Sequence, residues 1–315
     1  MRKLSHFYSA DYFKNIPVGV QEAIDFKKIK KPKIGLGKTL VLLFFNSSLR
    51  TRLSTEIAAK NIGMNVITMD MSQSWKWELN KGTKMRFDTA EHIKDAAKVI
   101  SSYADIVGIR AFPSLTDKKA DYRDDLLQKF MQYADVPVIN LESAIRHPLQ
   151  SLTDMMTIKE FQKSTKPKIV LSWAPHPKAL PQAVSNSFLE WAAAAGHKVT
   201  VTHPKGYELE SEFMQKHLVE YDQNKAFSEA DFVYVKNWSS VSDYGKVLDK
   251  SEDWRIDETL MSMTNEAKFM HCLPIRRNVV ATDAVLDSSN SLIYKQAKNR
   301  LHAAEYVLHE ILKNG

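Results

Sequence analysis

Short apolar segments that alternate with helix-like segments constrain the fold of this chain more than any other feature. Residues 39–45 are largely apolar, which suits a strand that is buried on both faces. A polar turn follows, and residues 49–61 then favour a helix that ends before Gly63. The same alternation continues along the chain, and strands joined by helices of about 10–15 residues predict parallel sheets.

Two such α/β units are predicted, and the length of 315 residues also favours two domains. The strands and helices of the first are predicted, in order, at 39–45, 49–61, 65–69, 92–104, 106–110, 123–133 and 136–141. Those of the second are predicted at 168–173, 179–196, 198–202, 208–219, 231–235 and 268–271. A helix at 153–165 is expected to join the domains, and a last helix at 296–312 to pack back on the first. The predicted domains are therefore residues 1–152 with 296–315, and residues 153–295.

Composition excludes several classes of protein. The longest apolar run, Leu40 to Phe45, has six residues, against about 20 for a membrane span, which excludes an integral membrane protein. The first residues contain no apolar signal core, so a cytoplasmic location is expected rather than secretion. Cys272 is the only cysteine, which excludes an internal disulfide and a cysteine-based zinc site. An excess of 44 Lys and Arg over 37 Asp and Glu gives a net charge of +7, which favours anionic partners.

Two other patterns suggest a nucleotide or a nucleic acid. Gly35–Thr39 imitates the end of a phosphate-binding P-loop, but the first glycine of that motif falls at Pro32 and the segment precedes a strand. No GxGxxG motif occurs, which disfavours a dinucleotide site. The lysine-rich segment Lys27–Lys33 could contact nucleic acid, although such a run before a strand more often forms a solvated surface loop.

The clearest candidate site follows the first strand, because ligands of α/β sheets gather at the carboxyl ends of strands. Ser48–Arg52 begins the next helix, and a helix N-terminus offers unpaired N–H groups and partial positive charge. The two hydroxyls and two guanidinium groups of this segment suit a tetrahedral phosphate. The alternative is a plainly capped helix with surface arginines, which is disfavoured because cations at a helix N-terminus need a compensating anion.

Further candidates follow other predicted strands. Arg110 ends one strand, where a surface charge is the alternative. His147 and Gln150 follow the next strand and could donate to a carbonyl and accept from an amide, although a lone histidine is more often structural. Cys272 follows the last strand within His271–Pro274. It is either a nucleophile, which needs a nearby histidine, or part of a bend whose main-chain carbonyls act.

In order and spacing, these motifs together resemble the aspartate/ornithine carbamoyltransferase superfamily. The motifs are Ser48-x-Arg50-Thr51-Arg52, Arg110, His147-Pro-x-Gln150, His271-Cys-Leu-Pro274 and Asn299-Arg300-Leu301-His302. The stretches 44–46, 108–113, 173–178, 235–238 and 273–279 resemble its N-acylornithine branch, which acts in arginine biosynthesis. The resemblance implies two α/β domains, with carbamoyl phosphate bound mainly by the first and N-acylornithine by the second. It also implies a homotrimer with active sites between subunits, and no cofactor or metal.

The resemblance assigns roles by position. Arg110, His147 and Thr51 would be catalytic and would polarise the carbamoyl oxygen. Carbamoyl phosphate would be bound by Ser48, Leu49, Arg50, Thr51, Trp75 (on a loop from the neighbouring subunit), Arg110, His147, Gln150, Cys272, Leu273 and Arg300. N-acylornithine would be bound by Ala90, Glu142, His176, Lys236 and Arg276. The implied reaction is direct attack of the δ-amine on the carbonyl carbon, after which phosphate leaves.

Departures from the ornithine enzymes narrow the second substrate. Lys236 stands where those enzymes bind a cationic amine, which disfavours free ornithine and favours a carboxylate beside an acylated nitrogen. N-acetylornithine enzymes carry a glutamate and a lysine where this chain has Ala90 and Val280. The missing glutamate leaves room for a succinyl carboxylate, so N-succinylornithine is preferred over N-acetylornithine. Glu91 would reverse this preference if the alignment shifted by one residue. A non-enzymatic phosphate-ligand or nucleic-acid binding protein is the alternative from another class.

Overall fold

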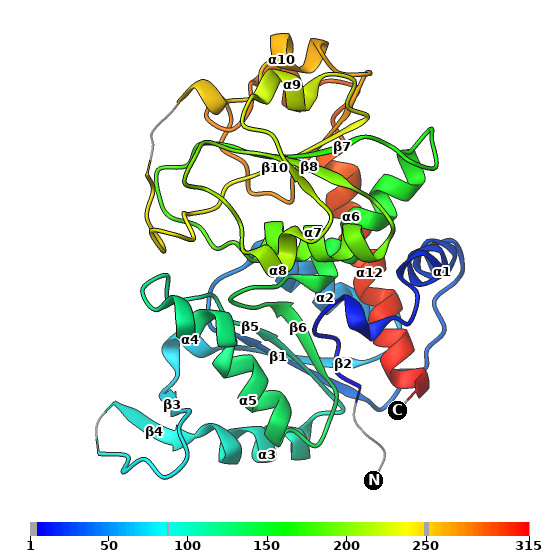
Figure 1. Ribbon diagram of the computed structural model, residues 1–315. Coiled ribbons are helices and arrows are strands. Elements are labelled where there is room, and N and C mark those ends of the chain that lie inside the picture. The colour runs from blue at the N-terminus through cyan, green and yellow to red at the C-terminus, as the bar shows by residue number, and fades with distance from the viewer. Residues whose placement is uncertain (1–4, 87, 249–251, 315) are drawn as a thin grey trace.

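The computed structural model describes residues 5–86, 88–248 and 252–314, and it contains two α/β domains, one above the other in Figure 1. The first sheet has the strand order β2-β1-β5-β6 and the second has the order β11-β10-β7-β8-β9, and the pairings within both are parallel. The strands are β1 (Thr39–Phe44), β2 (Asn65–Asp70), β5 (Ile106–Arg110), β6 (Val138–Glu142), β7 (Ile169–Trp173), β8 (Val199–Thr202), β9 (Leu218–Val219), β10 (Phe232–Lys236) and β11 (Lys268–Met270). The predicted fold class is confirmed.

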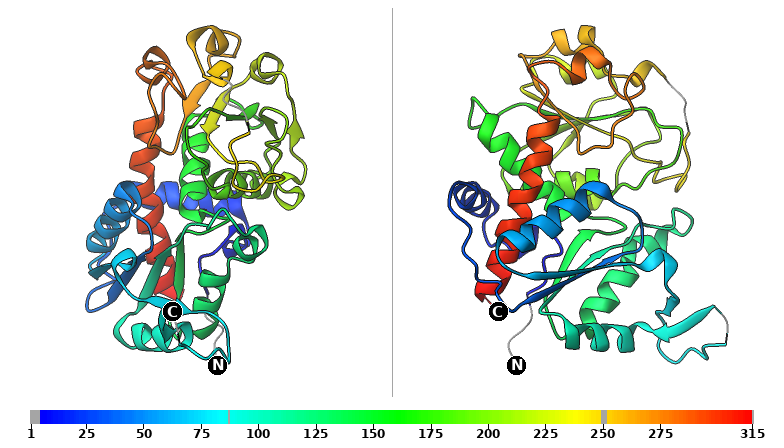
Figure 2. Two further views of the ribbon diagram at one scale, coloured as in Figure 1. Left: turned by 90° about the vertical axis from the view of Figure 1, so that its left-hand side faces the viewer. Right: turned by 180° about the vertical axis from the view of Figure 1, so that it is seen from behind.

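Helices cover both faces of each sheet (Figures 1 and 2). They are α1 (Ile16–Lys28), α2 (Leu49–Asn61), α3 (Ile93–Tyr103), α4 (Lys118–Arg123), α5 (Asp125–Tyr133), α6 (Pro148–Phe161), α7 (Ala183–Ala194), α8 (Ser211–Met214), α9 (Gln223–Phe227), α10 (Glu258–Ser262), α11 (Asp283–Leu286) and α12 (Ile293–Asn314). Short 3-10 turns lie at Ala10–Tyr12, Met71–Gln73 and Glu252–Trp254. One apolar cluster runs through both domains and includes Leu42, Leu152 and Leu171. Separate clusters, around Val107 and Val233, cover the other face of each sheet.

Two long helices tie the domains together. The first eleven residues of α6 are buried, from Pro148 to Ile158, because this helix lies between the two sheets. Helix α12 starts in the second domain beside β11 and runs back along α6, α2 and α1 to the first domain (Figure 1). The predicted return of the last helix is confirmed, and the domain-joining helix starts five residues earlier than predicted. Both helices reach the place where the sheets meet.

Several predicted elements differ from the observed ones. The helix predicted at 208–219 is wrong: only α8 forms, Gln215 has a φ of +36°, and β9 follows. His217 imposes this path, since its Nδ1 accepts the Val199 N–H (3.0 Å) and its Nε2 lies 2.8 Å from the Leu189 carbonyl oxygen. The helix predicted at 179–196 begins only at Ala183, after a proline. The helix predicted at 123–133 begins only at Asp125, because Asp124 has a left-handed conformation (φ +53°) that separates α5 from α4.

A two-stranded excursion leaves the first domain between β2 and α3. Its strands, β3 (Lys76–Glu78) and β4 (Thr89–His92), pair with each other and stand away from the main sheet at the lower left of Figure 1. Trp77 anchors the excursion by stacking on Phe130, with ring centres 5.8 Å apart. The neighbouring Trp75 is instead 60% exposed. Core packing therefore explains only one of the two tryptophans.

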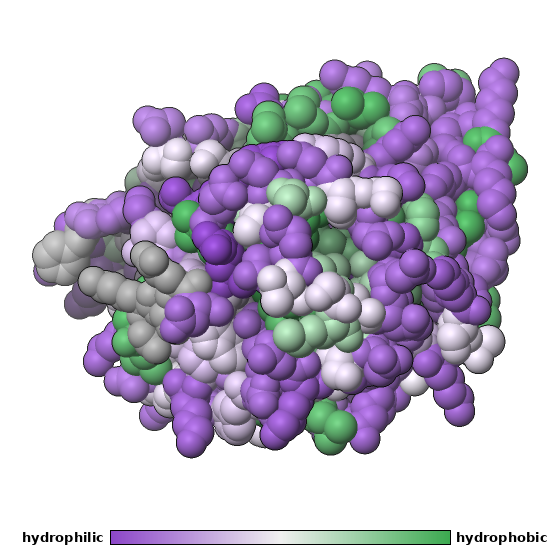
Figure 3. Space-filling model, turned by 90° about the horizontal axis from the view of Figure 1, so that it is seen from above, coloured by the Kyte–Doolittle hydropathy of each residue, from purple (hydrophilic) through white to green (hydrophobic). Residues whose placement is uncertain are grey.

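The outer surface agrees with the composition. In the view from above, hydrophilic residues cover most of the molecule and hydrophobic ones form small separate groups (Figure 3). Among the described residues, no helix is long and apolar enough to cross a membrane. The lysine-rich segment mostly binds the protein itself. Lys27 pairs with Glu160 (2.7 Å), and Lys31 donates to the Phe26 carbonyl at the end of α1 (2.6 Å).

Candidate active site

A cavity of about 830 Å³ lies where the carboxyl ends of strands from both sheets meet. Its walls come from the end of β2, from the segments that follow β1, β5, β6, β7, β10 and β11, and from α12. The predicted residues that line it are Ser48, Leu49, Arg50, Thr51, Arg110, Glu142, His147, Gln150, His176, Lys236, Cys272, Leu273, Arg276 and Arg300. The structure thus brings together every predicted site residue except Trp75 and Ala90.

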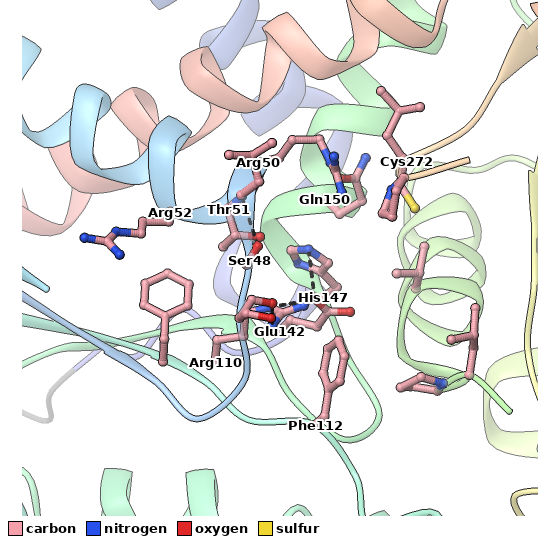
Figure 4. A pocket seen from close by; sticks show the side chains of 18 of the residues that line it. Ser48, Arg50, Thr51, Arg52, Arg110, Phe112, Glu142, His147, Gln150 and Cys272 are labelled. Atoms are coloured by element: carbon pink, nitrogen blue, oxygen red, sulfur yellow. Dashed lines mark hydrogen bonds and ion pairs between the residues drawn. The ribbon is translucent and has the colours of Figure 1, made fainter. Parts of the chain in front are cut away.

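The start of α2 forms one end of the cavity. The Ser48 hydroxyl oxygen accepts a hydrogen bond from the Thr51 main-chain N–H (3.3 Å) and caps the helix. The Arg50 Nε is buried without a hydrogen-bond partner among the described residues, and burial lowers the pKa of its guanidinium. Arg52 points away from this cluster (Figure 4) and pairs with Glu56 (2.8 Å). This end of the cavity can therefore bind an anion through the N-terminus of α2 and through Arg50, whose Nε has no partner in the described part of the chain.

Arg110 and Glu142 end the neighbouring strands β5 and β6, and the strand register pairs them. Glu142 Oε2 accepts from Arg110 Nε (3.1 Å) and lies 3.0 Å from Nη2. Arg110 Nη1 donates to the main-chain carbonyls of Asn46 (2.9 Å) and Ser47 (2.7 Å), and the guanidinium lies 4.1 Å from the centre of the Phe112 ring. Arg110 is only 6% exposed, so the surface-charge alternative is wrong.

His147, Thr51 and Arg300 form a buried group on the cavity wall. Arg300 Nη2 donates to Thr51 Oγ1 (2.7 Å) and to His147 Nε2 (3.3 Å). Because a guanidinium only donates, Nε2 must accept, and the neutral imidazole carries its proton on Nδ1. This Nδ1 has no hydrogen-bond partner among the described residues. Burial, followed by the charges of Arg300 and Arg110, holds the pKa of His147 well below its usual value, so the ring is neutral at pH 7.

Cys272 and Leu273 lie on the wall that follows β11. Burial raises the pKa of the Cys272 thiol, which is therefore protonated at neutral pH. The Leu273 N–H donates to His271 Nδ1 (2.8 Å), and Leu273 has a φ of +58°, a left-handed conformation that is unusual for leucine. This geometry favours a bend that acts through its main chain over a reactive thiolate.

A second positively charged cluster lies on the second-domain side of the cavity. It consists of Lys236 at the end of β10, His176 after β7 and Arg276 after β11. Arg276 Nε donates to His176 Nε2 (3.2 Å), while His176 Nδ1 lies 2.8 Å from the main-chain oxygen of Lys178. Burial is the main cause that lowers the pKa of His176, so its ring is neutral at pH 7. Lys236 and Arg276 are then the two cations of this cluster. Neither is paired with a carboxylate within the described residues, which favours an anionic ligand.

Sequence reasoning missed several residues of this cavity. Phe112 packs on the Arg110 guanidinium, and its main-chain N–H donates to Asn46 Oδ1 (2.7 Å). Leu180, Pro181 and Val184 add an apolar wall after β7. The available signals were the positions just after β5 and β7 and, for Phe112, the stretch 108–113, which indicated a family branch but no role for this side chain. Two further polar residues, Asp154 and Gln296, lie behind the wall.

The two predicted residues outside the cavity, Trp75 and Ala90, lie on the β3–β4 excursion. The Trp75 Nε1 donates to Glu91 Oε2 (2.8 Å), and Ala90 is exposed on β4. Their role at the site of a neighbouring subunit stays a prediction. Within the described part of the chain, no group of three or more His, Cys, Asp or Glu side chains is placed to hold a metal ion.

Comparison with known proteins decides the family. Residues 6–160 match the carbamoyl-phosphate-binding domain of aspartate/ornithine carbamoyltransferase, and residues 181–311 match its aspartate/ornithine-binding domain. The chain belongs to the aspartate/ornithine carbamoyltransferase family. Its relatives include N-succinylornithine carbamoyltransferase of Bacteroides thetaiotaomicron, which is 46% identical over 93% of either chain. N-acetylornithine carbamoyltransferase of Xanthomonas axonopodis pv. citri is 38% identical over 91% of this chain and 90% of its own.

Solved structures agree with this assignment to the carbamoyltransferases. Acetylornithine transcarbamylase complexed with acetylcitrulline superposes with a TM-score of 0.93 at 36% identity, covering 98% of this chain and 99% of its own. A glutamate-to-alanine variant of N-acetyl-L-ornithine transcarbamylase, complexed with carbamyl phosphate and N-succinyl-L-norvaline, also has a TM-score of 0.93 at 36% identity, covering 98% of this chain and all of its own. The predicted membership of the N-acylornithine branch is confirmed.

The neutrality of His147 has a consequence for stability. In the unfolded chain His147 takes up a proton near pH 6.5, whereas in the folded protein it stays neutral to much lower pH. Stability is therefore lost as the pH falls below 6.5. Between pH 7.5 and pH 5.5, the free energy of unfolding of the wild type should fall by about 1 kcal/mol more than that of His147→Gln. Urea unfolding of both proteins at the two pH values measures this difference. A parallel pH dependence of the two proteins would contradict a neutral His147.

Proposed function

We propose that this protein transfers the carbamoyl group of carbamoyl phosphate to the δ-amine of N-succinyl-L-ornithine, giving N-succinyl-L-citrulline and phosphate, in arginine biosynthesis. The 46% identity with the Bacteroides N-succinylornithine enzyme, against 38% with the N-acetylornithine enzyme, supports this substrate. The structural observation that carries the proposal is that one cavity holds two separate cationic clusters. The first suits a phosphate and the second suits carboxylates. A cytoplasmic location fits the unpaired Cys272.

Carbamoyl phosphate fits the first cluster. The phosphate would bind at the start of α2 beside Arg50. The carbamoyl oxygen, on which negative charge develops, would accept from Arg110, from His147 Nδ1–H and from the Thr51 hydroxyl. Because Arg300 already donates to Thr51 Oγ1, the hydroxyl hydrogen of Thr51 is free to donate elsewhere. The loss of one such preorganised donor typically costs about 10²–10³ in rate.

The chemistry requires little beyond positioning. The δ-amine nitrogen attacks the carbonyl carbon, and the tetrahedral intermediate collapses as the C–O bond to phosphate breaks. The leaving phosphate can take the amine proton. Holding both ligands in one cavity supplies an effective molarity of roughly 10⁵–10⁸ M. Both contacts between Glu142 and Arg110 use Glu142 Oε2, so the other oxygen is available to hold the attacking amine.

N-succinylornithine fits the second cluster better than ornithine does. It carries two carboxylates and no free α-amine, and Lys236 and Arg276 are two cations without a carboxylate partner among the described residues. A free α-amine beside Lys236 would place two positive charges together. The apolar residues Leu180 and Pro181 line the same side of the cavity and suit the succinyl methylene groups.

The excursion supports the succinyl substrate over the acetyl one. Successive side chains of a strand alternate in direction, so Ala90 and Glu91 of β4 do not occupy equivalent positions. Glu91 is already bound to Trp75 (2.8 Å), so Ala90 would be the small residue beside an incoming acyl group. Val280, the other departure, is buried in the core of the second domain and carries no charge to the cavity.

A second copy of the chain is needed to bring Trp75 and Ala90 to a cavity, and α2 offers a surface for it. Leu49, Leu53 and Ile57 form an apolar row along this helix and are 67%, 49% and 44% exposed. Ile67 and Met69 of the edge strand β2 are also exposed (51% and 44%). Exposed apolar stripes of this kind mark protein contacts. We therefore place the homotrimer interface here, at the rim of the cavity.

The two domains divide the substrates between them. The matches at 6–160 and 181–311 support two units, although the second match includes most of α12. We propose residues 1–152 and 153–295 as these units. We assign α12 (296–315 in the predicted division) to the first unit, since it packs on α1, α2 and α6.

The substrate is tested by a citrulline-forming assay with ornithine, N-acetylornithine and N-succinylornithine under one set of conditions. The highest kcat/KM is expected for N-succinylornithine, because only this compound offers two carboxylates to Lys236 and Arg276. Arg110→Ala, checked for folding by its melting temperature, should lose at least about 10²-fold in turnover. A preference for either other substrate, or a fully active Arg110→Ala, would contradict the proposal.

Ala90→Glu tests the acyl preference. A carboxylate at this position should repel the succinyl carboxylate, so the kcat/KM ratio of N-succinylornithine to N-acetylornithine should fall by about tenfold or more. Ala90→Gln has the same size without the charge and should shift the ratio much less. If the ratio is the same in Ala90→Glu and the wild type, β4 does not contact the acyl group.

Subunit complementation tests the shared site. Arg50→Ala damages the cavity and Trp75→Ala damages the excursion, so each variant alone should be nearly inactive. Random mixed trimers of the two should regain about a quarter of the wild-type sites, because a site then combines an intact cavity with an intact neighbouring loop. Co-expression with two affinity tags gives the mixed protein for assay. Activity no higher than that of the two separate variants would show that each chain builds its own site.

A further inference from the structure

A buried polar network lies behind the cavity wall and contacts Gln150. Gln150 is one helical turn before Asp154 in α6, and its Nε2 donates to Asp154 Oδ1 (2.7 Å). The same oxygen accepts from Nε2 of Gln296 in α12 (2.7 Å). None of the three side chains is more than 1% exposed. Water therefore cannot replace a partner in this network without a rearrangement of the wall.

The direction of each hydrogen bond in this network is fixed by chemistry. Gln296 Oε1 accepts from the main-chain N–H of His271 (2.9 Å), which can only donate, so the Gln296 amide nitrogen must face Asp154. Asp154 Oδ1 accepts, so Gln150 must also turn its nitrogen toward Asp154. Gln150 Oε1 is then left over. It is buried without a hydrogen-bond partner among the described residues, and Gln150 lines the cavity.

We propose that Asp154 is a positioning residue that gives the cavity an acceptor wall for the NH2 group of the carbamoyl ligand. Through Gln150 it fixes one acceptor oxygen. Through Gln296 and His271 it anchors the segment after β11, whose main-chain carbonyls at Cys272 and Leu273 supply the others. This inference rests on the proposed carbamoyl transfer and adds the residue that sets the polarity of the wall.

The wall selects between ligands that differ in one group. A carbamoyl NH2 donates two hydrogen bonds, whereas the methyl group of acetyl phosphate donates none and leaves buried acceptors unpaired. The selection does not depend on the charge of Asp154. Burial raises the pKa of this carboxyl to about 7, with the bonds from Gln296 and Gln150 acting in the opposite direction. A proton on Oδ2 leaves Oδ1 as an acceptor for both amides.

Asp154→Leu removes the acceptor at similar size and tests the proposal. The measured quantity is the inhibition constant of acetyl phosphate divided by the KM of carbamoyl phosphate, both obtained with N-succinylornithine as the second substrate. With Asp154→Leu this ratio should fall by about 10–100-fold, because Gln150 is free to turn its amide. The inhibition constant of inorganic phosphate should not change, since phosphate binds at the start of α2.

Two variants serve as controls. Asp154→Asn keeps an acceptor oxygen for both glutamines and should restore the ratio to within a few-fold of the wild type. Thr153→Val removes the neighbouring buried hydroxyl, which donates to the Leu149 carbonyl of its own helix (2.7 Å) and takes no part in the network. It should leave the ratio unchanged, which separates the effect of Asp154 from a general disturbance of α6.

Gln296→Met covers the case in which Asp154→Leu does not fold. It keeps the bond between Gln150 and Asp154 but frees His271, so the ratio should fall several-fold through the Cys272–Leu273 carbonyls. An unchanged ratio in a folded Asp154→Leu or Gln296→Met, or an equal loss in Asp154→Asn, overturns the proposal. A wild type without any carbamoyl transfer would instead overturn the proposed function, so the two failures are distinguishable.

Discussion

Positive charge gathered in one cavity, and partly buried there, is the constraint on which the rest of this structure depends. Six of the side chains that line it are cationic, against two acidic ones, Asp70 and Glu142. Burial lowers the pKa of Arg50 and of Arg300, because removing a cation from water costs free energy. Such an excess is stable only with an anion in place or with rigid partners that hold the cations apart. The cavity is therefore built for a ligand that carries several negative charges.

The fold supplies those rigid partners through strand register and helix packing. A shift of register at the ends of β5 and β6 pairs Arg110 with Glu142, so the two meet without any loop having to position them. The start of α2 is fixed by its cap at Ser48, and α12 brings Arg300 across to it. Parallel strands place all their carboxyl ends at one edge, so two sheets facing each other yield two ligand subsites with one shared space. The neutral state of His147 is a consequence, since a further charge there would meet three cations.

The sequence predicted the elements whose signals are local and missed those decided by distant contacts. Helix 49–61 follows from neighbouring residues and matches the structure at both ends. The stretch at 208–219 has the composition of a helix, but pairing with β8 and the ring of His217 override it. Among site residues, motifs located the cations. Asp154 lies outside the motifs, and Phe112 lies in a stretch that indicated the family branch but no role. The contacts of both emerge only when strands and helices from separate parts of the chain meet. Trp75 and Ala90 are a different case, because they lie outside the cavity of their own chain, and the proposed shared site needs a second copy.

Two buried ionisable side chains on long helices divide the wall of the cavity into a donor side and an acceptor side. Arg300 can only donate, so Thr51 and His147, which receive its hydrogen bonds, are left with hydrogens to offer. Asp154 accepts at Oδ1, so Gln150, which donates to it, is left with an oxygen to offer. A carbamoyl group has an acceptor oxygen on one side and donor hydrogens on the other, and this division matches it. Burying ionisable side chains is costly, and hydrophobic replacements would often be no less stable. Arg300 and Asp154 fix the direction of their neighbours' hydrogen bonds, and apolar residues cannot do this.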